Sequence, residues 1–143
     1  MLGYLKMTTA ALATLALAAC ATVPGAADAP PSAKVQSYLD HAGEPVESFR
    51  LFGNVDSWNP LSDHRLLVRT GVRDTYLLSV DASCLNLQFA NRIALTTSLG
   101  NRVQTGFDYV RFDDGFQGQR CRITDIRPVD ADAARKDLAT SNG

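Results

Sequence analysis

Six short segments rich in β-branched and aromatic residues constrain the fold of this chain more than any other feature. They span residues 47–52, 65–70, 75–80, 92–97, 107–112 and 119–127, and turn-forming residues separate them. Such segments are typical of β-strands. Residues 71–74 predict a hairpin between the second and third strands, and residues 113–118 predict another between the last two. We expect an antiparallel sheet of about six short strands that curls on itself as a small barrel or a roll.

Two helices are expected beside this sheet. Ser32 is a good N-cap, and apolar residues then recur at helical spacing until Gly43, so residues 33–42 predict a short amphipathic helix. Residues 131–138 have high helix propensity and predict a short C-terminal helix. The expected fold class is therefore α+β, mainly antiparallel β, with one helix before the sheet and one after it.

The first nineteen residues have the layout of a secretory signal peptide. A start carrying Lys6 precedes an apolar segment about half as long as the ~20 residues that a membrane-spanning helix requires. Residues 17–20, Leu-Ala-Ala-Cys, closely resemble the bacterial lipobox. That resemblance implies cleavage before Cys20, lipid on its sulfur and a membrane as partner. Because Ala21 rather than an aspartate follows, it also implies the inner leaflet of the outer membrane, facing the periplasm.

Cleavage before Cys20 leaves 124 of the 143 residues, which is the length of one domain. Residues 20–31 are rich in alanine and proline and predict an extended tether. We expect a single globular domain over residues 32–138 and a disordered tail over 139–143. Lys6 is the only charge lost with the leader, so 13 basic and 15 acidic side chains leave a formal net charge of −2. This balance gives no support for nucleic-acid binding.

The cysteine count predicts one disulfide. Three cysteines are present, and lipidation of Cys20 leaves only Cys84 and Cys121 to pair. The periplasm is oxidising, and an isolated thiol is a liability there. We therefore expect a Cys84–Cys121 bridge with Cα atoms about 4.4–6.8 Å apart.

Short patterns in the second half of the chain carry a family resemblance. They are Cys84 and residues 76–81 (Tyr-Leu-Leu-Ser-Val-Asp), 92–96 (Arg-Ile-Ala-Leu-Thr), 106–110 (Gly-Phe-Asp-Tyr-Val), 121–123 (Cys-Arg-Ile) and 128–130 (Pro-Val-Asp). Over roughly residues 45–130 the chain resembles a group of small, uncharacterised proteobacterial lipoproteins. The resemblance implies the lipid anchor and the cysteine pair, and it implies no activity.

The sequence predicts no catalytic residue. Ser62, Asp63 and His64 are the residue types of a hydrolase triad, but consecutive side chains point apart. A triad needs its histidine between the nucleophile and the carboxylate. We interpret the three as a polar loop that continues from residues 58–61, in which Trp58 caps the core.

No metal or cofactor site is predicted either. His41 and His64 are the only histidines, and neither belongs to a known metal-binding spacing. Asp108, Asp113 and Asp114 lie close in sequence but lack the ligand spacing of a calcium loop. We interpret these aspartates as turn residues and solvated charges.

The last two predicted strands place basic residues together. Because side chains alternate along a strand, Tyr109 and Arg111 share one face of the first strand, and Arg120 and Arg122 share one face of the second. Arginine suits the phosphates and carboxylates of lipopolysaccharide, phospholipid headgroups and cell-wall peptides. This pattern predicts an anion-binding face. The alternative is an ordinary solvated face whose arginines pair with nearby acids, namely Asp113, Asp125 and Asp130.

Two classes of function remain open from the sequence. The first is a lipid-anchored, non-catalytic module of the cell envelope that binds an anionic envelope ligand or a partner protein. The alternative is a periplasmic hydrolase of an envelope component, with its residues assembled from separate loops. A concave pocket holding His64 or His41 with a carboxylate and a hydroxyl favours the enzyme. An open sheet face with clustered arginines favours binding.

Overall fold

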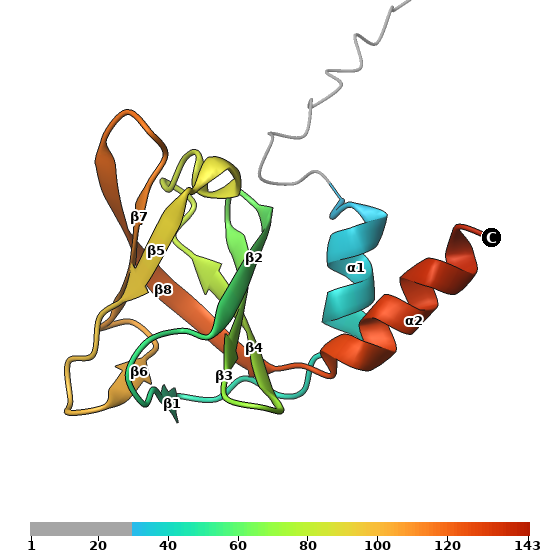
Figure 1. The fold of residues 1–143 in the computed structure, drawn as a ribbon, viewed down its shortest axis with the longest axis horizontal. Helices are drawn as coiled ribbons and strands as arrows, with labels where there is room; N and C mark the ends of the chain where they lie inside the picture. The colour runs from blue at the N-terminus through green and yellow to red at the C-terminus, as the bar shows by residue number, and fades with distance from the viewer. Residues whose placement is uncertain (1–29) are drawn as a thin grey trace, which may run out of the picture.

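A curled antiparallel sheet with two helices beside it forms the architecture of this protein (Figure 1). The computed structural model describes residues 30–143. The six strands of the main sheet follow the spatial order β2-β3-β4-β8-β7-β5, and every neighbouring pair is antiparallel. The prediction of a mainly antiparallel β fold is therefore confirmed. The strands are β2 (Ser57–Ser62), β3 (Arg65–Thr70), β4 (Asp74–Val80), β5 (Arg92–Leu95), β7 (Tyr109–Asp113) and β8 (Gly118–Pro128).

The long strand β8 curls the main sheet into a half-barrel. Its first half pairs with β7, and its second half pairs with β4 through a register shift at Ser79 and Val80. Such irregularities bend a strand and increase its twist. Figure 1 shows β8 crossing behind the other strands and joining the two halves of the sheet. Within the described residues, the edge strands β2 and β5 do not pair with each other, so the curl stays open.

Two strands were not expected from the sequence. Residues 58–61, interpreted as a loop, lie instead in β2. Pro60 argues against a strand because it lacks an N–H group, but β2 lies at the edge of the sheet, where proline is tolerated. The other is β6 (Arg102–Gln104), which pairs with β1 (Ser48–Arg50) as a separate two-stranded sheet. Strands β1 and β6 are each only three residues long, and β6 is too short to show a clear alternating pattern in the sequence.

Helices α1 (Ala33–Asp40) and α2 (Ala131–Ser141) pack on one side of β3 and β4. The Ser32 hydroxyl accepts a hydrogen bond from the Val35 N–H (3.3 Å), and the Asp130 carboxylate caps α2 in the same way. Residues 139–141, assigned to a disordered tail, belong to α2, so the predicted helix end at residue 138 is three residues early. No helix in residues 30–143 is long and apolar enough to cross a membrane. The apolar contact between helices and sheet consists of Tyr38, Leu67, Leu77, Val129 and Ala134.

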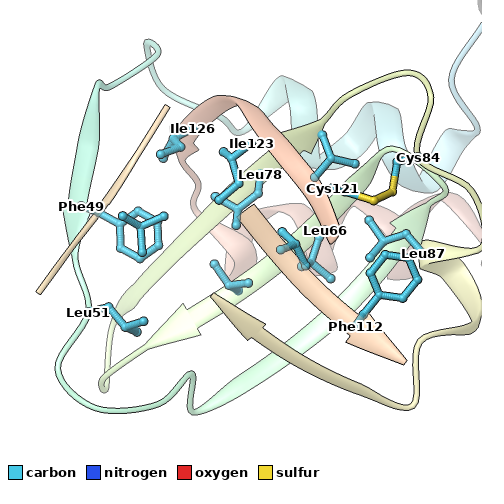
Figure 2. Packing of buried hydrophobic residues seen from close by; sticks show 14 residues of the cluster. Phe49, Leu51, Leu66, Leu78, Cys84, Leu87, Phe112, Cys121, Ile123 and Ile126 are labelled. Carbon is cyan, nitrogen blue, oxygen red and sulfur yellow. A yellow bond between two sulfur atoms is a disulfide. The ribbon is translucent and has the colours of Figure 1, made fainter. Parts of the chain in front are cut away.

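The main core fills the inside of the curl (Figure 2). Leu66, Leu78 and Ile123 are fully buried there. Cys84 and Cys121 belong to the same cluster and form a disulfide with Cα atoms 5.6 Å apart. The predicted disulfide is thus confirmed, and it ties the segment after β4 to the middle of β8.

Asp108 is not the solvated charge that the sequence analysis expects, because its side chain is fully buried (0% exposed). Its carboxylate accepts hydrogen bonds from the Thr96 hydroxyl (2.8 Å), the Ser98 hydroxyl (2.7 Å) and the Gln104 N–H (2.8 Å). These three donors replace the water that burial removes. The carboxylate thereby holds the loop between β5 and β7 against the start of β7.

Candidate functional site

The pairing of β7 with β8 brings the predicted anion-binding residues together on the outside of the sheet. Tyr109 lies opposite Arg122, and Arg111 lies opposite Arg120. The three arginines are exposed and Tyr109 is half-buried, whereas the alternating residues of both strands point into the core. We call Tyr109, Arg111, Arg120 and Arg122 the arginine face.

Tyr109 holds two guanidinium groups side by side. The Arg120 Cζ lies 4.2 Å from the centroid of the Tyr109 ring, and the Arg122 Cζ lies 5.6 Å from it. Arg122 also donates a hydrogen bond from Nη2 to the Tyr109 hydroxyl (3.2 Å). A cation over an aromatic ring is stabilised by about 0.5–1 kcal/mol at an exposed site. The ring therefore offsets part of the repulsion between the two like charges and fixes their positions.

The acids considered as partners for these arginines contact other groups instead. The Asp113 Oδ2 atom lies 3.5 Å from the Arg92 Nη2 atom, and the Asp125 Oδ2 atom lies 2.8 Å from the Arg127 Nε atom. Asp130 accepts a hydrogen bond from the Ala133 N–H at the start of α2. Within residues 30–143, no carboxylate oxygen lies within 4 Å of the guanidinium nitrogens of Arg111, Arg120 and Arg122.

Strand β5 extends this surface in a way that the sequence analysis does not foresee. Its register places Ala94 beside Arg111 and places Arg92 beside Asp113. On the other side of β7, Gly118 lies opposite Asp113. Ala94 and Gly118 carry little or no side chain, and a shallow hollow of about 700 Å³ lies over them, with Arg92, Arg111 and Arg120 in its lining. The sequence predicts a strand at residues 92–97, but it does not show which strand lies beside it.

The opposite end of the arginine face carries one carboxylate. Asp81 and Ser83 line a hollow of about 410 Å³ together with Tyr109, Arg120 and Arg122. Asp81 accepts hydrogen bonds from the Ser83 N–H (2.9 Å) and hydroxyl (2.8 Å). These bonds are the main reason that the pKa of Asp81 is lowered, and the charge of Arg122 lowers it further. Asp81 therefore stays ionised near neutral pH and adds a negative charge at this end of the arginine face.

The residue types of a hydrolase triad are not assembled at the β2–β3 turn. The His64 N–H donates to the Ser62 hydroxyl oxygen (3.3 Å), which is a backbone contact of the turn. The Asp63 Oδ1 and His64 Nδ1 atoms are buried and have no hydrogen-bond partner within residues 30–143. No hydrogen bond joins the three side chains to one another in this part of the chain.

His41 lies in a groove of about 710 Å³ between α2 and strands β2 to β4. Carboxylates and hydroxyls also line this groove, among them Asp130 and Tyr38. However, the His41 Nε2 atom lies 2.5 Å from the carboxylate of Asp137, which does not line the groove. Within the described residues no hydroxyl is hydrogen-bonded to the His41 ring, so the nucleophile–base contact of a hydrolase is not formed. The same residues contain no cluster of three or more metal-ligating side chains.

Residues 4–142 match a family that is described as a family of unknown function (DUF6491). The chain belongs to this family. No curated protein and no solved structure matches the chain. Cys20 and the predicted signal peptide lie outside the described residues. Family membership therefore leaves the function to be argued from the geometry of the arginine face.

Proposed function

We propose that this protein is a lipid-anchored, non-catalytic module of the cell envelope that binds an anionic ligand on its arginine face. One observation supports the proposal above the others. Three exposed arginines lie on adjacent strands, and none has a carboxylate partner within 4 Å in residues 30–143. Exposed guanidinium groups without a carboxylate partner offer paired N–H donors to a phosphate or carboxylate of a ligand.

The resemblance of residues 17–20 to a lipobox supports the proposed location at the membrane. A diacylglycerol and an amide-linked acyl chain on Cys20 exceed the two signals that stable membrane attachment requires. Anchored at Cys20, the domain meets the phosphates of lipids and lipopolysaccharide at close range. The shallow, apolar floor at Ala94 and Gly118 suits a ligand that carries apolar groups beside its anionic ones.

The proposal is tested by titrating the mature protein, in neutral detergent and at low ionic strength, with inositol hexakisphosphate as a soluble phosphate probe. Changing Arg111, Arg120 and Arg122 to glutamine should weaken binding about tenfold or more, since each lost charge contact contributes roughly 0.5–1 kcal/mol. Binding to the parent protein should also fall as salt is added.

Two further variants sharpen this test. Changing Lys34, Arg50 and Arg73 to glutamine removes the same charge from other surfaces and should leave binding within about twofold of the parent. A Cβ atom at Gly118 meets no other atom within 4 Å, so Gly118→Leu should fold normally and block the hollow. Absence of binding by the parent protein, or an equal loss in both triple variants, would contradict the proposal.

A further inference from the structure

Three exposed apolar side chains gather at the end of the molecule next to the arginine face. Phe116 lies at the β7–β8 turn and is 96% exposed, while Leu85 and Phe89 are each 61% exposed. Leu85 and Phe89 belong to the segment between β4 and β5, which contains the 3-10 helix η2 (Leu87–Phe89). Figure 1 places η2 and the β7–β8 turn at the same end, at the top of the view. We call Leu85, Phe89 and Phe116 the apolar tip.

Hydrogen bonds join the two segments that form the apolar tip. Asn86 donates from its side-chain amide to the Asp114 carboxylate (3.3 Å), and the Asn91 N–H donates to the Asp113 carbonyl oxygen (2.8 Å). Asp114 also accepts from the backbone N–H of Phe116 (3.0 Å). These bonds hold the backbones of the two segments together, so little additional backbone ordering is required when the tip binds.

The exposed side chains of the tip are not needed for the core. Leu87, in the same segment as Leu85 and Phe89, is fully buried and already anchors that segment to the main cluster. Exposing a phenylalanine ring to water forgoes the stabilisation that its burial would provide. Apolar residues gathered at one exposed end therefore indicate a surface that is covered in the working protein.

The spacing between the apolar tip and the arginines fits a bilayer surface. Arg111 and Arg120 lie two residues from the strand ends at Asp113 and Gly118, which corresponds to about 7 Å along the strands. Apolar groups of peripheral proteins enter the headgroup region by about 5–10 Å. Phe116 lies in the turn beyond these strand ends, so the two guanidinium groups follow its ring towards the lipid phosphates when the ring enters the headgroup region.

We infer that the apolar tip and the arginine face together dock onto an anionic bilayer. The inference rests on the proposed function, because the same arginines supply the anion contacts. Three arginines near the tip (Arg92, Arg111 and Arg120) outnumber two aspartates, Asp113 and Asp114. Asp113 lies beside Arg92, and Asp114 accepts hydrogen bonds from the turn. The anchor implied at Cys20 keeps a membrane within reach, since residues 20–31 can span ~40 Å at most.

The test uses the mature chain with Cys20→Ala, which removes the affinity that the lipid itself contributes. Co-sedimentation is measured with vesicles of phosphatidylcholine and phosphatidylglycerol in equal parts, and with vesicles of phosphatidylcholine alone. Binding should require the anionic lipid, and Phe116→Ala should reduce it about tenfold, as expected for one phenylalanine withdrawn from an apolar environment. Phe52→Ala, at another exposed ring (75% exposed) outside the tip, should leave vesicle binding unchanged.

Binding of inositol hexakisphosphate separates this inference from the proposed function. Phe116→Ala should retain parental affinity for that soluble probe, since it leaves the arginines in place. A parent chain that binds the probe but not the vesicles overturns membrane docking and leaves the proposed function standing. A chain that binds neither overturns both. Self-association that Phe116→Ala abolishes, in a chain that does not bind vesicles, assigns the tip to a second copy of the protein and also overturns the inference.

Discussion

Asp108 connects a buried carboxylate to the position of the arginine face. Its partner Thr96 also accepts a hydrogen bond from the Tyr109 N–H (2.9 Å), so the start of β7 is held through this cluster. Asp108→Ala removes a fully buried acceptor for two hydroxyls and for the Gln104 N–H. Ser98 is exposed and can turn to water, whereas Thr96 and Gln104 are partly buried. Leaving such donors without a partner costs about 1–3 kcal/mol each. We therefore expect urea unfolding to show a loss of about 3 kcal/mol or more.

Asp125→Ala provides the matched control for that experiment. Asp125 pairs with Arg127 at a partly exposed position, where an ion pair contributes only about 0–1 kcal/mol. If Asp108→Ala destabilised the protein no more than Asp125→Ala, the hydrogen bonds of Asp108 would not stabilise the fold.

The β7–β8 hairpin depends on the charge of Asp114 at its turn. The backbone N–H groups of Phe116 and then Gln117 donate to this carboxylate and lower its pKa. Because the folded-state pKa lies below the unfolded value, the stabilisation is complete above the unfolded value and is lost as pH falls through the folded one. In an NMR titration, the Phe116 and Gln117 amide protons should shift with a midpoint below the ordinary aspartate value of about 3.9.

Asp114→Asn should abolish this titration without unfolding the sheet, since the residue lies in an exposed turn. A midpoint at or above the ordinary aspartate value would show that these hydrogen bonds do not form in solution. The same variant should loosen the position of Phe116, which links the turn to the apolar tip.

At the scale of the whole molecule, the Cys84–Cys121 disulfide closes a loop that contains η2, β5, β6 and β7. The closed loop spans 38 residues with both cysteines included, and the chain-entropy model assigns it ~4 kcal/mol. A domain of this size is stable by only about 5–15 kcal/mol. Reduction should therefore lower the free energy of unfolding by roughly 2–5 kcal/mol, measured by urea unfolding of the oxidised and reduced chain. A difference below about 1 kcal/mol would contradict this expectation.

Local patterns in the sequence were sufficient to predict the features that depend on residues close together in the chain. Alternation along a strand is a steric property of the backbone, so the shared face of Tyr109 and Arg111 follows from the sequence once residues 107–112 are recognised as a strand. Turn chemistry located the β3–β4 and β7–β8 hairpins, where Gly71 and Gly115 have positive φ angles of 87° and 92°. The count of cysteines and the compartment implied by the leader identified the disulfide.

Only the tertiary structure decided which distant segments meet. The sequence does not show that β5 lies beside β7, so the hollow over Ala94 and Gly118 was not predicted. Pro60 lies in a strand because β2 is an edge strand of the sheet that residues 30–143 form, and Asp108 is buried because the segment between β5 and β7 folds over it. The tertiary structure likewise decides that Asp113 pairs with Arg92, on a neighbouring strand, and not with an arginine of the arginine face. Each of these features depends on contacts between residues far apart in the chain, and a local pattern contains no information about such contacts.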